Sequence, residues 1–179
     1  GTPEPDGCLN LITGILDSDE VLRAARAHGV SLTVYIASAV IYCISEIQNE
    51  RVPEKKRQRP IKLLIPVNLR KMFGSESLRN FVLYITPGID PRMGDYRFEE
   101  ILKTMYHQMG MELTDKQMGA RITANVRAEQ SPFLKVMPLF IKNIAMKAVY
   151  NLVGEKKSCL TVSNLGAVAL PPEMEPYVE

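Results

Sequence analysis

The chain of 179 residues has no tryptophan, only three cysteines and only two histidines. Cys8, Cys43 and Cys159 form neither a Cys-x-x-Cys pair nor a spacing with histidine that is typical of a metal centre, so no metal site is predicted. Cys43 and Cys159 lie in apolar runs. We expect both to be buried as small hydrophobic side chains in a reducing cytosol, which makes the predicted location cytoplasmic.

Several motifs that carry chemistry are also missing. The sequence contains no Gly-x-Ser-x-Gly turn, no P-loop, no Gly-x-Gly-x-x-Gly fingerprint, no His-Glu-x-x-His and no EF-hand spacing. These absences argue against a hydrolase serine, nucleotide binding by those loops, and zinc or calcium sites. The net charge of +2, with 46% apolar and 23% charged residues, is ordinary for a soluble globular domain. Neither bulk charge nor interleaved basic and aromatic residues predicts nucleic-acid binding.

The two histidines are the first candidates for a general base, since a base whose pKa lies near about 7 suits acid–base chemistry at neutral pH. His28 is expected in the last turn of a helix, where carbonyl groups favour an imidazole, and His107 in the middle of another helix. Neither has a second histidine beside it. We interpret both as structural or surface residues, so no catalytic residue is assigned in this chain.

The length predicts a single domain over residues 1–179. Residues 1–7 are polar, lack the basic-then-apolar order of a signal peptide, and are interpreted as a linker or tail, while residues 171–179 are expected to be loosely ordered. The nearly uncharged stretch 30–47 is about as long as a membrane span. Its serines and its lack of an aromatic belt favour instead a helix buried on most sides. No membrane span is predicted.

Hydrophobic periodicity predicts strands at 9–16, 61–67, 81–86 and 160–162 and helices at 19–27, 31–49, 97–113, 115–129 and 133–153, the last with a break near residue 138. Asp17 or Ser18 is expected to cap the first helix, and Ser31 or Thr33 the second. This order predicts an α/β fold, a two-layer sandwich with a mixed β-sheet and helices mainly on one face. The strand at 61–67 has consecutive apolar residues and is expected to be covered on both faces.

Polar residues gather at the ends of the predicted strands. They are Asn68, Arg70, Asn80, Ser163 and Asn164. Ligand-facing side chains collect at strand ends in α/β folds, and serine or asparagine can orient a carbonyl or donate to an oxyanion. The alternative is that these are ordinary turn residues. The basic loop 50–60 is interpreted as a solvated connector, with phosphate binding as its alternative.

Three of these segments, in this order, resemble parts of a known family. Pro66–Arg70 resembles a strand ending in Pro-Val-Asp/Asn-x-Arg, Asn80–Val82 resembles a Gly-Asn-Phe-Val-Asn region, and Ser163–Gly166 resembles a Ser-Asn-Leu-Gly turn. Residues 25–33 resemble the turn that opens the buried helix in the same family. Together they are similar to the C-terminal half of a CoA-dependent acyltransferase of the chloramphenicol acetyltransferase-like superfamily, in its condensation-domain or alcohol acetyltransferase-like branch.

In that family two similar halves enclose a channel in which an acyl thioester meets an alcohol or amine. The resemblance implies that Asn68, Arg70, Asn80, Ser163 and Asn164 line or brace this channel, with a structural ion pair as the alternative for Arg70. It also implies acyl-CoA as co-substrate and no covalently bound cofactor. The catalytic His-His-x-x-x-Asp-Gly run of the first half is absent here. The expected partner is therefore a missing N-terminal half, and this chain alone is expected to be inactive.

Two other functions stay open. The first is a non-catalytic binding or scaffolding module of the same fold. The second is a peripheral membrane protein that uses the basic, methionine-rich helix at 133–153, although its apolar residues suit a core or a contact between the two halves. Because the surface facing a missing half would be apolar, we expect the fragment to self-associate as a two-fold homodimer.

Overall fold

The computed structural model describes residues 11–130, 138–149, 158–166, 171, 173–174 and 177. The predictions for residues 1–7, for Cys8, for both ends of the helix at 133–153 and for most of the tail at 171–179 lie outside the described residues. The helices are α1 (Ser18–Ala27), α2 (Leu32–Arg51), α3 (Arg70–Phe73), α4 (Phe98–Glu112), α5 (Asp115–Gln130) and α7 (Leu139–Val149), with short 3-10 helices η1 (Lys55–Arg57) and η2 (Pro91–Met93). The strands are β1 (Ile61–Asn68), β2 (Val82–Ile85), β3 (Gly88–Ile89) and β4 (Leu160–Thr161).

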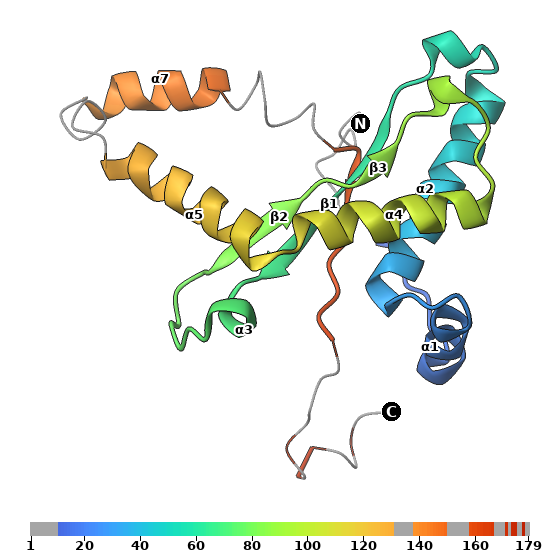
Figure 1. The fold of residues 1–179 in the computed structure, drawn as a ribbon, viewed down its shortest axis with the longest axis horizontal. Coiled ribbons are helices and arrows are strands. Elements are labelled where there is room, and N and C mark those ends of the chain that lie inside the picture. Colours follow the sequence, from blue (N-terminus) through green and yellow to red (C-terminus); the bar gives the residue numbers. More distant parts are fainter. Residues whose placement is uncertain are drawn as a thin grey trace.

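The sheet is built around β1, which pairs antiparallel with β2 and β3 and parallel with β4. Ile65 pairs with Ile85 and Ile61 with Ile89, so β2 and β3 follow one register along the same edge of β1. Pro87 lies between β2 and β3. Its carbonyl accepts a hydrogen bond from the Leu63 N–H of β1 at 3.0 Å. Because proline has no N–H, the return hydrogen bond of the ladder is missing, and the strand is divided at this residue. The fold is therefore α/β with a small, open, mixed sheet of four strands, as predicted at this level (Figure 1).

The outer edge of the β2–β3 strand is closed by side chains from two helices. Gln108 of α4 accepts a hydrogen bond from the Gly88 N–H at 2.8 Å and donates its Nε2 to the Gly88 carbonyl at 3.0 Å. Its amide thus takes the place of the backbone of a further strand. On α5, Arg121 Nη1 donates to the Tyr84 carbonyl at 3.1 Å. These contacts fix α4 and α5 to the sheet.

The core lies between α2, α4 and the sheet. Val34, Ala37 and Ile41 recur at helical spacing on α2 and face the alternating buried residues of β1. The remaining buried apolar residues of this cluster are Ile61, Leu63, Ile65, Leu69, Ile85, Ile89, Ile101, Met105, Met109 and Met118. Met118 brings the start of α5 into the same core, whereas Figure 1 shows α7 lying beyond the sheet, at the opposite end of the molecule from α1.

The predicted helix starts are confirmed. Asp17 caps α1, because its Oδ1 accepts hydrogen bonds from the N–H groups of Asp19 and Glu20, each at 2.9 Å. Ser31 caps α2, because its Oγ accepts a hydrogen bond from the Val34 N–H at 3.3 Å. In each case a side-chain oxygen satisfies an N–H group that has no partner within the helix.

Two strand predictions are wrong. The described part of the opening strand, residues 11–17, has no regular structure, and its Leu11, Ile12, Ile15 and Leu16 side chains are 77–95% exposed. A loose apolar alternation forms a strand only where it pairs with a sheet edge, and residues 11–17 pair with none of the described strands. β1 is fully covered on one face only, since Ile61, Leu63 and Ile65 are buried, whereas on the other face Lys62 is exposed and Leu64 and Pro66 are partly buried. The apolar run therefore reflects an amphipathic strand of an open sheet.

Three burial predictions are also wrong. Cys43 and Cys159 are exposed, because Cys43 lies off the buried stripe of α2 and Cys159 precedes the two-residue edge strand β4. α2 itself is buried along one stripe rather than on most sides, and Ile36 and Ile47 are exposed on it. The apolar composition of this segment thus exceeds what the described core covers.

Candidate functional site

The five residues singled out from the sequence fall into two groups. Ser163 and Asn164 follow β4, whereas Asn68, Arg70 and Asn80 surround the loop between β1 and β2. Although β4 runs parallel to β1, the hydrogen-bonded pairing ends at Val162, whose N–H donates to the Leu64 carbonyl at 2.9 Å. No hydrogen bond within the described ranges joins the two groups. The structure therefore offers two separate sites rather than one.

Asn164 holds the segment after β4 against the start of α2. Its Nδ2 donates to Thr33 Oγ1 at 3.0 Å, and its Oδ1 accepts a hydrogen bond from the Gly166 N–H at 2.8 Å. Gly166 has a φ of 75°, a backbone conformation that side chains other than glycine rarely adopt. The local Ser-Asn-Leu-Gly turn is thus shaped by Asn164 and Gly166 and is fixed in place by Thr33.

A pocket of about 300 Å³ lies beside this turn. It is lined by Thr33, Ile36, Val162, Ser163, Asn164 and Leu165. Its lining is mostly apolar, with two hydroxyls and one amide as its polar groups, which is the usual composition of a small-molecule site. Ser163 is exposed and lines the pocket, and no described residue forms a hydrogen bond with its hydroxyl. That hydroxyl is therefore available to a ligand, whereas the Asn164 amide is used in the turn.

The second group braces a loop. Asn68 Oδ1 accepts a hydrogen bond from the Arg70 N–H at 3.1 Å, and Arg70 donates from Nε to the Ser77 carbonyl at 2.8 Å and from Nη2 to the Arg79 carbonyl at 2.7 Å. The described partners of the guanidinium are carbonyl oxygens rather than the carboxylate of the ion pair that was the alternative for Arg70. Asn80 is exposed at the start of β2. Arg70 thus has a structural role in the β1–β2 loop.

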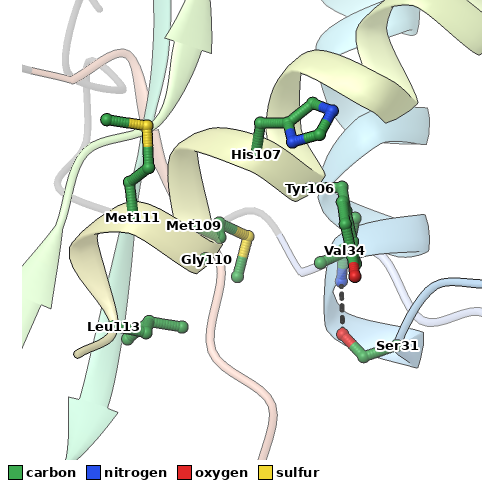
Figure 2. A pocket seen from close by; sticks show the side chains of 8 residues that line it. All are labelled: Ser31, Val34, Tyr106, His107, Met109, Gly110, Met111 and Leu113. Carbon is green, nitrogen blue, oxygen red and sulfur yellow. Dashed lines mark hydrogen bonds between the residues drawn. The ribbon is translucent and has the colours of Figure 1, made fainter.

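Another pocket, of about 400 Å³, lies between α4 and the start of α2. Figure 2 shows its lining of Ser31, Val34, Tyr106, His107, Met109, Gly110, Met111 and Leu113. The His107 ring lies well away from the Ser31 hydroxyl, which accepts a hydrogen bond from the Val34 N–H instead. The pocket is therefore a methionine-rich apolar site without a paired nucleophile and base.

The ion pair between Asp90 and Arg92 lies outside both groups of candidate site residues. In η2 the Arg92 guanidinium donates to the Asp90 carboxylate at 2.8 Å and lowers the pKa of Asp90.

Among the described residues, no group of three or more His, Cys, Asp or Glu side chains is placed to hold a metal ion. No single helix in the same ranges is long and apolar enough to cross a membrane, and the one pair that passes together, α1 and α2, is bent by 87°.

Sequence reasoning found Ser163 and Asn164 but missed Thr33 and Ile36 as members of the same pocket. Thr33 stood out only as a possible helix start, and nothing in the sequence relates it to a residue 131 positions away. Comparison of the chain with protein-family models, with curated proteins and with solved structures finds no match.

Proposed function

We propose that this chain is the C-terminal half of an acyltransferase that moves an acyl group from a CoA or carrier thioester to an alcohol or amine. In this proposal its sheet and helices form half of a two-layer, CoA-dependent acyltransferase-like sandwich. The order of the Pro66–Arg70, Asn80–Val82 and Ser163–Gly166 segments supports it. The missing N-terminal half would carry the paired histidines that this sequence lacks.

The observation that carries the proposal is the Ser163–Asn164 turn beside an apolar pocket. Asn164 and Thr33 fix the turn, and the Ser163 hydroxyl lies at the pocket without a described hydrogen-bond partner. A hydroxyl held at an apolar wall can donate to a thioester carbonyl oxygen, and more strongly to the oxyanion that develops from it. A volume of about 300 Å³ is at the small end of the range for ligand pockets and suits a short acyl group.

The chemistry divides between the two halves. The base on the N-terminal half removes the proton from the acceptor hydroxyl or amine as its oxygen or nitrogen attacks the thioester carbonyl carbon. The carbon–sulfur bond then breaks, and the thiolate leaves and takes up the proton from the base. In this scheme Ser163 stabilises the carbonyl oxygen, and Asn164 positions Ser163 by holding the turn. Arg70 acts only by bracing the β1–β2 loop.

A non-catalytic binding module of the same fold is the second candidate. One observation favours it: none of the six residues that line the pocket beside Ser163 can titrate near neutral pH. A pocket of this kind binds an apolar ligand without any chemistry on it. Both candidates require ligand binding at Ser163, and only the first requires a base from another segment.

The experiment is an assay of the complete native gene product with acetyl-CoA and a series of simple alcohols and amines. Turnover is measured as the amount of free thiol released. We expect Ser163→Ala to lower kcat by about 10²-fold, as expected for loss of an oxyanion donor. Ser18→Ala on α1, which is also exposed, serves as the control and should leave kcat unchanged. Acetyl-CoA turnover that is insensitive to Ser163→Ala would contradict this role for the pocket.

A further inference from the structure

The α7 helix carries five large apolar side chains that nothing in the described structure covers. Leu139, Phe140, Ile141, Ile144 and Met146 are all exposed, with Phe140 at 67% and Ile144 at 68%. Figure 1 shows the helix standing beyond the sheet rather than against it. A contiguous apolar surface on a soluble protein usually marks a binding surface.

The apolar and polar residues of α7 are unevenly distributed around its axis. Phe140, Ile141 and Ile144 follow the spacing that places residues on one side of a helix. Asn143 and Lys147, four residues apart, border this side along one edge, and Lys142 lies opposite it. Lysines at the edge and back of an apolar helix side can extend their ammonium groups to lipid headgroups while that side is buried in a membrane interface.

The charge of this region has one sign. Residues 131–154 contain lysines at 135, 142 and 147 and no aspartate, glutamate or arginine. The rest of the chain is nearly balanced, because all 179 residues together carry a net charge of only +2. A basic segment free of acidic residues is complementary to a negatively charged lipid surface, where each lysine contributes about 1 kcal/mol.

We propose that α7 docks the protein on the surface of an anionic lipid bilayer. Phe140, Ile141 and Ile144 enter the boundary between headgroups and acyl chains, and Lys142 and Lys147 extend to the phosphate groups. The 11 described residues of the helix measure about 16 Å, whereas a bilayer core is about 30 Å thick, so this segment is proposed to lie on the membrane rather than across it. A second copy of the chain is a poorer occupant, because a stable protein interface takes about 20–30 residues a side.

The test is co-sedimentation of the 179-residue protein with phosphatidylcholine vesicles, prepared with and without phosphatidylserine. We expect binding only to the vesicles that contain phosphatidylserine, and loss of that binding at high salt. Lys142→Gln and Lys147→Gln should each weaken binding about fivefold. Ile144→Asn should abolish it. Lys116→Gln on α5 and Leu78→Asn, a 99% exposed apolar residue outside α7, are the matched controls and should bind like the unchanged protein.

Three outcomes would overturn the proposal. The first is no binding to either kind of vesicle by a protein whose circular dichroism shows it to be folded. The second is binding that Leu78→Asn lowers as much as Ile144→Asn, which would indicate nonspecific apolar adsorption. The third is a concentration-dependent dimer that Ile144→Asn dissociates, which would show that a second copy occupies α7. All three readouts are independent of acyl transfer, so the failure of one proposal does not decide the other.

Discussion

Asn164 and Thr33 form a hydrogen bond of 3.0 Å that joins the segment after β4 to the first turn of α2, across 131 positions of sequence. The two-residue strand β4 alone provides few contacts to hold this segment in place. The Asn164–Thr33 bond therefore fixes the position of the Ser163 hydroxyl at its pocket. The integrity of the proposed site depends on this pair.

Removal of the Asn164–Thr33 hydrogen bond should lower the free energy of unfolding slightly and should displace the Ser163 hydroxyl from its pocket. We expect Thr33→Val, which keeps the shape and deletes the hydroxyl, to lower the free energy of unfolding by about 0.5–1.5 kcal/mol in urea titrations. Asn164→Ala should have a larger effect, because it also removes the bond to the Gly166 N–H. In a double-mutant cycle the two changes should be coupled; additive effects would mean that the bond does not form in solution.

Gly88 is predicted to tolerate no side chain. A Cβ at this position would lie 2.1 Å from the Ile61 carbonyl oxygen, because β3 passes close to β1 there. We expect Gly88→Ala to lower the free energy of unfolding by about 1–3 kcal/mol or more. Gly119→Ala is the matched control, since apart from the adjoining backbone of α5 no atom lies within 4 Å of a Cβ in that position. It should raise stability by about 0.5–1 kcal/mol, and equal effects of the two substitutions would refute this reading.

The two hydrogen bonds between Gln108 and Gly88 should account for the attachment of α4 to β3. Gln108→Glu keeps the size of the side chain but removes the donor to the Gly88 carbonyl, so a stability loss of about 1–3 kcal/mol is expected near neutral pH. Protonation of the new carboxyl at low pH restores a donor, and the loss should shrink as pH falls. The difference in melting temperature between the two proteins, measured from pH 7 to pH 4, checks this. A difference that grows toward low pH would be inconsistent with the two-bond arrangement.

Arg70 should protect the β1–β2 loop from cleavage. Its guanidinium binds the Ser77 and Arg79 carbonyls, and its loss leaves the loop without these two contacts. Limited proteolysis by trypsin should cleave Arg70→Ala after Arg79 several times faster than the unchanged protein. Lys71→Ala, which changes an exposed cation at the adjacent position, is the control. Equal cleavage rates in both variants would show that Arg70 does not brace the loop.

The sequence was sufficient for the elements whose signals are local. The caps Asp17 and Ser31 and the long helices α2, α4 and α5 follow from side-chain chemistry and periodicity, and their positions were predicted to within about two residues. Strand β3 was missed, because two residues after a proline carry no periodicity. The exposure of Cys43 was missed as well, because apolar composition does not reveal which side of a helix finds a partner.

The candidate site shows the same difference between local signals, which the sequence reveals, and tertiary contacts, which it does not. Ser163 and Asn164 were recognisable as polar residues after an apolar strand, whereas their contact with Thr33 depends on tertiary structure that no spacing encodes. Asn68, Arg70 and Asn80 had the same local pattern, and in the structure Asn68 and Arg70 organise a loop. Strand-end polarity therefore indicates where such residues lie, and only the fold separates those at a pocket from those that shape a turn.

The most direct test of the acyltransferase account is the intact mass of the native gene product, together with the sequence of whatever precedes Gly1. The account predicts a longer polypeptide in which a His-His-x-x-x-Asp-Gly run lies upstream, on a first half of similar size. A native product that begins near Gly1 and carries no such run would contradict the account and leave a binding module.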